Sequence, residues 1–136
     1  MGDGTWGMED GVAEPLASVQ NFRDLRVWQA AMVLAESVYE VTRCLPREEL
    51  FGLSAQLRRA VVSVPSNIAE GHSRTGTGEH LHHLSIALGS LAEVQTQLEL
   101  VQRLEFASPE CVEPCLVGAV RLARQIHALR NALRDR

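Results

Sequence analysis

Several residue types are scarce or missing in this chain. It has no lysine, so its 13 basic residues are all arginine, and aromatic residues make up only 4% of its 136 residues. Few aromatics together with many Leu, Ala and Val favour helices packed by aliphatic side chains over a β-sheet. Its three cysteines are too few for a disulfide framework, and a chain of this length buries roughly two thirds of its unfolded surface without one. The composition predicts a single all-α domain.

The sequence also lacks a long apolar run that would cross a membrane, and its acidic first residues are unlike a signal peptide. We therefore expect a cytoplasmic protein in which Cys44, Cys111 and Cys115 are reduced thiols. Cys111 and Cys115 would share one face of a helix. A bridge or redox pair at these two positions is the alternative.

Charge is unevenly distributed along the chain. Residues 1–20 hold four acids and no base, which accounts for the whole net charge of −4, so the 13 arginines of residues 21–136 are balanced by the remaining acids. Non-specific affinity for nucleic acid needs clustered cations, and a neutral domain is therefore unlike a protein that coats a duplex. We expect residues 1–20 to be a flexible acidic leader and residues 21–136 to form the folded domain.

Apolar residues at helical spacing predict a first helix with Asp24 as its N-cap and Leu45-Pro46 at its end. Its expected buried face consists of Trp28, Ala31, Met32, Ala35, Val38, Tyr39 and Thr42. A second helix should close at Gly71, because glycine readily adopts the left-handed conformation. Pro65 lies inside this helix, and its missing N–H predicts a kink or a helix restarted with Ser63 as cap.

A third helix should begin with Thr77 as cap and run to about Phe106. Gly89 in its middle predicts the close approach of another backbone. A fourth should begin at Ser108-Pro109, or at Glu113 if Pro114 delays it. The short connections imply an antiparallel, up-down-up-down four-helix bundle. A three-helix core with one displaced helix is the alternative.

The second helix has more than one face that calls for a neighbour. Its apolar stripe consists of Leu53, Leu57, Val61, Val64 and Ile68. A polar stripe lies beside it, made of Gln56, Arg59, Ser63, Asn67 and Glu70. The remaining side carries Ala55, Val62 and Ala69 instead of charges, and the third helix repeats the design with Ser90, Glu93 and Gln97. These stripes predict a contact between helices or between copies of the chain.

Within that contact we expect Arg59 to lie opposite Glu93, because an interfacial arginine is normally matched by a carboxylate. We also expect Asn67 or Glu70 to satisfy the carbonyl that Pro65 frees. Two ordinary solvated helix edges are the alternative.

Three segments carry a family resemblance: FRDLRVWQAA at 22–31, FGLSAQLRRAVVSVPSNIAEG at 51–71, and IALGSLAEVQTQLEL at 86–100. Together they resemble the bacterial four-helix-bundle family named for the 23S ribosomal RNA intervening-sequence proteins. The resemblance implies a left-handed bundle that assembles as a ring, usually a pentamer, and an association with ribosomal RNA. A more distant similarity is to the accessory variability proteins of retroelements, pentameric bundles that hold nucleic acid and a reverse transcriptase.

The chain departs from this family where the third helix opens. His80, His82, His83, Ser85 and Leu88 stand where the family has aromatic and basic residues. Since neutral histidine binds phosphate weakly, this change disfavours the RNA hypothesis and leaves the ring hypothesis intact.

His72 and the His80-x-His82-His83 cluster suggest a metal site, because His80 and His83 would share a helical face. No third or fourth ligand follows at definite spacing, so half-buried imidazoles in the place of aromatics are the favoured interpretation and no metal or cofactor is expected.

The end of the fourth helix is the candidate for phosphate contacts. It carries Arg121, Arg124, Arg130, Arg134 and Arg136. Complementing the helix dipole and keeping the surface soluble is an equally weighted alternative.

No catalytic motif is present in the sequence: it has no Gly-rich phosphate loop after a strand, no HExxH and no nucleophile elbow. We therefore predict a non-enzymatic homo-oligomeric scaffold or adaptor. An RNA-binding accessory protein, acting with ribosomal RNA or a reverse transcriptase, is the alternative.

Overall fold

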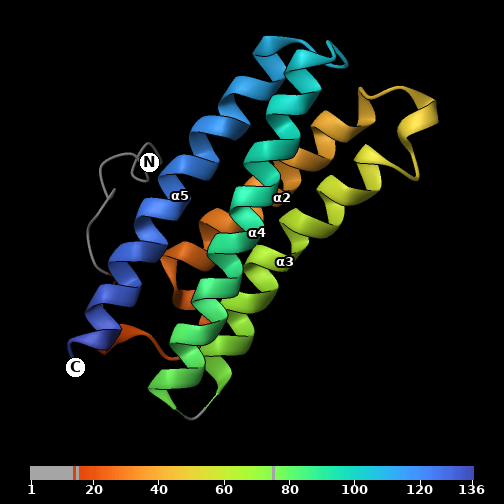
Figure 1. The fold of residues 1–136 in the computed structure, drawn as a ribbon. Helices are drawn as coiled ribbons and strands as arrows, with labels where there is room; N and C mark the ends of the chain where they lie inside the picture. The colour runs from red at the N-terminus through yellow and green to blue at the C-terminus, as the bar shows by residue number, and fades with distance from the viewer. Residues whose placement is uncertain (1–13, 15, 75) are drawn as a thin grey trace.

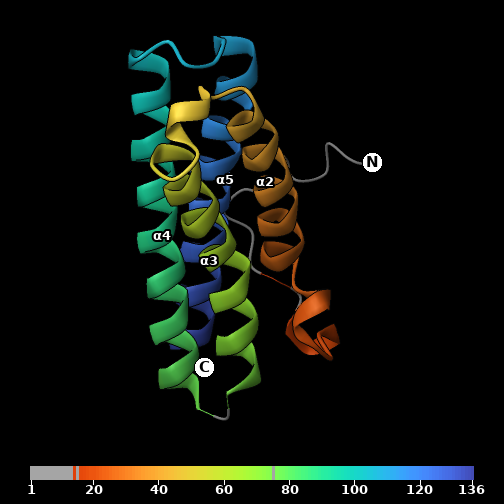
Figure 2. The same cartoon turned by 90° about the vertical axis from the view of Figure 1, so that its right-hand side faces the viewer.

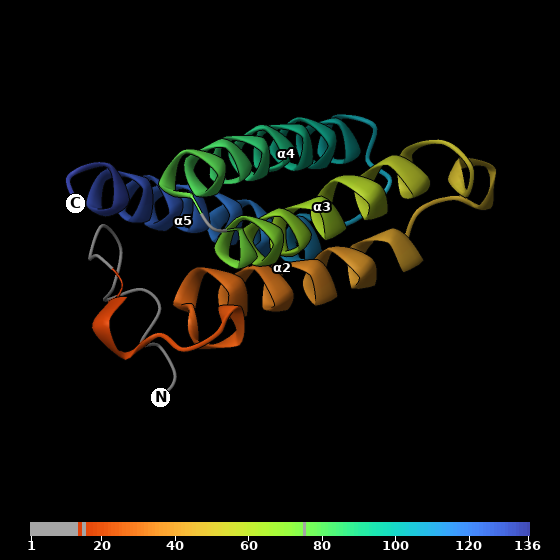
Figure 3. The ribbon, with the colours of Figure 1, turned by 90° about the horizontal axis from the view of Figure 1, so that it is seen from below.

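The computed structural model describes residues 14, 16–74 and 76–136, and over these the chain forms helices and no strand. The four α-helices are α2 (Arg26–Arg43), α3 (Leu53–Ser73), α4 (Thr77–Arg103) and α5 (Pro109–Arg134). Single 3₁₀ turns lie at Leu16–Ser18, Phe22–Asp24 and Arg47–Glu49. Each helix turns back along the one before it (Figure 1), and all four run side by side when seen from below (Figure 3). The prediction of an all-α four-helix bundle is confirmed.

Aliphatic side chains from all four helices fill the core. The predicted apolar stripe of α3 is buried along its whole length, at Leu53, Leu57, Val61, Val64 and Ile68. Among the largest fully buried side chains are Leu84, Leu91 and Leu98 of α4 and Leu122, Ile126 and Leu129 of α5. The packing of α3 against α4 is the most extensive of the helix pairs, and that of α2 against α5 is the least extensive among neighbours.

The predicted buried face of α2 was partly wrong. The residues that α2 buries are Val27, Ala31, Leu34, Val38, Val41 and Thr42, whereas Met32 is exposed and Trp28 only partly buried. This helix has apolar residues on two adjacent sides, so periodicity alone could not choose between them.

The start of α2 also differs from the prediction. Asp24 does not cap α2, because its carboxylate accepts from the backbone N–H groups of Gln20 (2.9 Å) and Asn21 (3.2 Å) in the preceding turn. These two bonds lower the pKa of Asp24. The N-cap position is held by Leu25, which has no side-chain acceptor.

Glu14 supplies the missing cap. Its buried carboxylate accepts from the N–H groups of Arg26 (2.9 Å) and Val27 (3.0 Å), the first two residues of α2. Most of the predicted leader, residues 1–13 and 15, lies outside the described residues, but Glu14 and the partly buried Leu16 and Val19 contact the bundle. A carboxylate here satisfies donors that no earlier turn can reach and complements the positive end of the helix dipole.

The prediction that Gly71 closes α3 in a left-handed conformation is wrong. The helix continues through Gly71 to Ser73. A Cβ at Gly71 would lie 2.7 Å from the Cβ of His83 and 3.3 Å from the carbonyl oxygen of His80, both on α4. Gly71 is therefore needed because the two helices approach closely at this point.

Gly89 shows the opposite behaviour. The prediction that another backbone approaches it is wrong for the described residues, since a Cβ at Gly89 would meet none of their atoms within 4 Å. Pro65 lies inside a continuous α3, so the helix does not restart at Ser63, and Pro114 likewise lies inside α5. The earlier of the two predicted starts of α5 is the observed one, with Ser108 as N-cap and Pro109 in the first turn.

Candidate functional site

Polar side chains of α3 and α4 form a row of contacts between the two helices, called the ladder below. Its members are Gln56, Ser63, Asn67 and Glu70 of α3 and His83, Ser90 and Gln97 of α4. The hydroxyl oxygens of Ser63 and Ser90 lie 2.8 Å apart. One rung further along, the Gln97 amide donates to Gln56 Oε1 at 3.4 Å. The partners on each helix are seven residues apart, so each rung stands two turns from the next on the same face.

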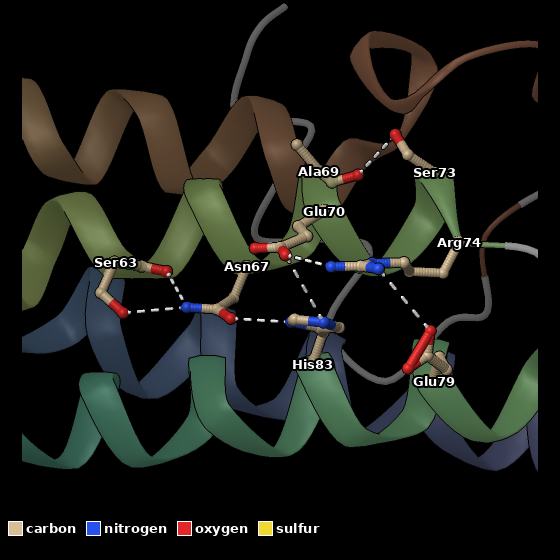
Figure 4. A network of polar contacts seen from close by, with 8 residues as sticks. All are labelled: Ser63, Asn67, Ala69, Glu70, Ser73, Arg74, Glu79 and His83. Atoms are coloured by element: carbon tan, nitrogen blue, oxygen red, sulfur yellow. Dashed lines mark hydrogen bonds and ion pairs between the residues drawn. The ribbon is translucent and has the colours of Figure 1, made fainter.

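Asn67 fixes the direction of the hydrogen bonds in the middle of the ladder (Figure 4). Its amide nitrogen donates to the carbonyl oxygen of Ser63 (2.9 Å) and to Ser63 Oγ (3.0 Å). Its amide oxygen therefore faces Nδ1 of His83 at 2.9 Å, and that nitrogen must carry the proton and donate. With Ser63 Oγ already accepting from Asn67, its hydroxyl proton is free to point at Ser90.

The far end of the ladder is charged. Arg74 donates to the Glu70 carboxylate at 2.6 Å, and this bond, with the nearby His83, lowers the pKa of Glu70. His83 Nε2 lies 3.9 Å from the same carboxylate, and a second nitrogen of Arg74 lies 3.9 Å from Glu79 on α4. Figure 4 shows these groups converging between the two helices. Because Arg74, Glu70 and Glu79 are exposed, the ion pairs among them contribute little stability.

The structure thus brings most of the two predicted polar stripes together, but two detailed predictions fail. Among the described residues, no ion pair joins Arg59 to Glu93, although both line one groove. Asn67 and Glu70 do not satisfy the carbonyl freed by Pro65: Asn67 donates to the Ser63 carbonyl instead, and Glu70 accepts from Arg74.

His83 belongs to the ladder, and sequence reasoning missed it by grouping it with the other histidines. The available signal was spacing, because His83, Ser90 and Gln97 repeat at seven residues, as do Gln56, Ser63 and Glu70 on α3.

A groove of about 470 Å³ lies beside the first rungs. Its lining consists of Gln56, Arg59, Ala60, Ser63, Ser90, Glu93 and Gln97. Arg59 and Glu93 are both exposed in it, and Gln97 Oε1 is buried without a hydrogen-bond partner. Beyond the groove, Leu100 in the last turn of α4 and Leu104 just after the helix are exposed apolar residues. The groove thus combines two exposed charges that do not pair with each other and neighbouring exposed aliphatic side chains.

The other histidines do not gather as metal ligands. His80 is buried between the helices, 9% exposed, and burial, with smaller effects of His72 and His83, lowers its pKa to about 4. Its ring meets that of His72 edge to face at 5.7 Å, while His82 is exposed. Over residues 14, 16–74 and 76–136, no three His, Cys, Asp or Glu side chains come together as a metal would require.

The predicted cluster of arginines is spread over different sides of α5. Arg121 and Arg124 lie on one surface with Leu116, Val117 and Val120. Arg130 follows Arg124 by six residues, a rotation of about 240° around the helix, so it points to another side. Its Nε is buried without a hydrogen-bond partner, and Arg134 donates to Asn131 at 2.7 Å. The five arginines, Arg136 included, therefore do not all lie on one surface, and phosphate contact by any of them stays a prediction.

All three cysteines are free thiols. Burial raises the pKa of Cys115, and both partial burial and a hydrogen bond with the Cys111 thiol raise the pKa of Cys44. Cys111 on α5 is therefore a neighbour of Cys44 after α2 as well as of Cys115 one turn along. For Cys44 and Cys115 the pKa is shifted upward, which is opposite to the lowered pKa that marks a reactive thiolate.

Comparison with known proteins points to one family. The family model described as "23S rRNA-intervening sequence protein" matches residues 23–128. Among solved structures, a crystal structure of a protein of unknown function from the S23 ribosomal protein family of Bacteroides thetaiotaomicron is similar, with a TM-score of 0.66 and 23% identity. The match covers 80% of this chain and 95% of that one, and at this identity it supports the fold alone. No curated protein matches the sequence. In the described part of the chain, none of the helices combines the length and apolarity needed to cross a bilayer.

Proposed function

We propose that this chain, which belongs to the family of 23S rRNA-intervening sequence proteins, is a non-catalytic homo-oligomeric scaffold or adaptor, most simply a pentameric ring. The proposal includes no catalytic activity, no cofactor and a cytoplasmic location. The main partner that we propose is another copy of the same chain.

The observation that carries this proposal is the groove between α3 and α4. It presents an exposed arginine, Arg59, and an exposed carboxylate, Glu93, that do not pair with each other, next to the buried and unpartnered oxygen of Gln97. A second copy that brings opposite charges to Arg59 and Glu93 would pair both groups across the interface.

Gly89 supports the same conclusion. A glycine in the middle of a helix costs about 1 kcal/mol relative to alanine, and no other part of the described structure lies within 4 Å of where its Cβ would be. It is next to Ser90, the middle rung of the ladder. Close approach of a neighbouring copy would explain the residue.

Size-exclusion chromatography with light scattering tests the proposal. We expect several copies per particle at micromolar concentration and moderate salt. One copy per particle under these conditions would contradict it. Arg59→Glu should weaken the assembly by about tenfold or more, as expected for loss of an interfacial charge pair. Arg23→Glu, at an exposed arginine outside the groove, is the matched control.

RNA binding is the second candidate function. It is favoured by the surface on α5 where Arg121 and Arg124 lie together beside apolar residues. In this hypothesis the arginines contact phosphates of ribosomal RNA or of RNA held by a reverse transcriptase. Fluorescence anisotropy with labelled ribosomal RNA fragments tests it. Binding should weaken steeply with salt and be reduced by Arg124→Gln, and salt-independent binding would refute a phosphate contact.

A further inference from the structure

Helices α2 and α5 leave an apolar hollow between them. It has a volume of about 180 Å³ and is lined mainly by Ala30, Val33, Leu34, Pro114, Gly118 and Leu122. Val33 is 58% exposed, although it is an aliphatic residue in the middle of α2. Val117 and Val120 of α5 are also exposed and extend the apolar surface beyond the hollow.

The turn between α2 and α3 carries the most exposed large apolar side chain of the described residues. Phe51 is 92% exposed, and its neighbour Leu50 is exposed as well. Figures 1 and 2 place this turn, drawn in yellow, on the side of the bundle away from α5. The turn and the hollow are therefore two different surfaces, and Phe51 does not fill the hollow of its own chain.

Size and charge make the two surfaces complementary. A cavity of about 150 Å³ lined by aliphatic and aromatic side chains is known to hold a benzene molecule, so a hollow of about 180 Å³ has room for a phenyl ring. The turn carries two acids, Glu48 and Glu49, against one base, Arg47, and the lining of the hollow includes Arg121, with Arg124 on the adjoining surface. A turn with a net negative charge thus matches a hollow with a basic edge.

We propose that Phe51 of one copy of this chain inserts into the α2–α5 hollow of a second copy, with Glu48 next to Arg121. The proposal rests on the homo-oligomer proposed above and adds the residues that join neighbouring copies. Because the inserted residue and the hollow lie on different surfaces, each contact leaves one of each free. Copies therefore add head to tail until the last hollow receives the first Phe51, which is how a closed ring forms.

Two variants, each affecting one half of the contact, test this arrangement. Phe51→Ala removes the inserted side chain and keeps the hollow. Val33→Glu keeps Phe51 but places a carboxylate at the hollow, where it repels Glu48. Both positions are exposed, so the variants should keep the wild-type circular dichroism. In light scattering, each should need at least about tenfold more protein than the wild type to assemble. Val62→Ala, an exposed valine on α3 outside both surfaces, should assemble like the wild type.

Mixing the two variants gives the decisive result. The Phe51→Ala protein still offers an intact hollow, and the Val33→Glu protein still offers Phe51, so one intact contact can form between them. We expect particles of two copies, one of each variant, at a concentration where either alone is monomeric. A mixture that stays monomeric would overturn the proposed contact.

The controls separate the two proposals. Wild-type protein with one copy per particle would refute the homo-oligomer, and the Phe51 contact with it. If the wild-type protein assembles and the Phe51→Ala variant, measured separately, assembles equally well, only the Phe51 contact is refuted. Assembly lost in Phe51→Ala and retained in Val33→Glu would show that Phe51 enters some other surface, which also overturns the assignment of the hollow.

Discussion

Ser63 and Ser90 face each other across α3 and α4 with their hydroxyl oxygens 2.8 Å apart, at the middle of a polar ladder between two otherwise aliphatic helices. On either side stand the Gln56–Gln97 rung and the contact of His83 with Asn67 and Glu70. Polar partners at such positions define the register of two helices, because sliding one past the other would leave each group unpaired.

A double-mutant cycle measures the coupling of this rung. Ser63→Ala and Ser90→Ala should each destabilise the protein, and the two effects should be non-additive by about 0.5–1.5 kcal/mol in urea unfolding. As a control, Ser85→Ala removes an exposed hydroxyl that bonds only within its own helix, to the Leu81 carbonyl at 3.1 Å. Its effect should add to that of Ser63→Ala, and full additivity for the Ser63/Ser90 pair would disprove the coupling.

Gly71 and Gly89 should respond oppositely to alanine. Gly71→Ala places a Cβ 2.7 Å from that of His83, so α3 and α4 must separate, at a cost of about 1–3 kcal/mol. Gly89→Ala meets no neighbour among residues 14, 16–74 and 76–136 and should stabilise the fold by up to about 1 kcal/mol through helix propensity. Thermal unfolding at a concentration that keeps the protein monomeric compares the two. Equal responses would show that helix propensity alone determines both.

Glu14 should stabilise the first helix from outside it. Glu14→Ala leaves the N–H groups of Arg26 and Val27 without their acceptor, which should cost about 1–2 kcal/mol. Glu36→Ala, at an exposed position inside α2, should change stability by less than about 0.5 kcal/mol. The midpoint of urea unfolding checks both, and a Glu14 variant as stable as the Glu36 variant would refute the capping role.

His80 should make the fold sensitive to acid. Burial holds its pKa at about 4, below the usual 6.5, so the unfolded chain binds this proton more readily than the folded protein. The contribution of neutral His80 is fully present above pH 6.5 and is lost as the pH falls from 6.5 towards 4. His80→Phe should flatten the decline of stability over this range.

His82→Ala, at an exposed position, is the control for the His80 experiment and should leave the wild-type pH profile unchanged. Glu70 and Asp24, whose pKa values are lowered in the fold, also lose stabilising interactions in acid, so the comparison is between variants at each pH. A His80→Phe profile parallel to that of the wild type would contradict the assignment.

The sequence predicted much of the α3–α4 pair but little of its detail. The stripe from Leu53 to Ile68 and the polar residues beside it follow from spacing within one helix, which is a local property. The failure of the Arg59–Glu93 pair has a different cause, because a distance between two side chains depends on the rotation and offset of both helices. His83 was assigned to a histidine cluster because its partner, Asn67, is 16 residues away along the chain.

The sequence by itself determined that this chain forms four aliphatic helices and which face of α3 enters the core, since both depend on periodicity within short segments. The tertiary structure alone decided which of two apolar sides α2 buries, why position 71 must be glycine, and that Glu14 caps a helix twelve residues further on. It also divided the arginines of α5 between different surfaces and placed the turn between α2 and α3 on the side of the bundle away from α5. Each of these depends on packing between residues distant in the chain, which the pattern within one helix does not encode.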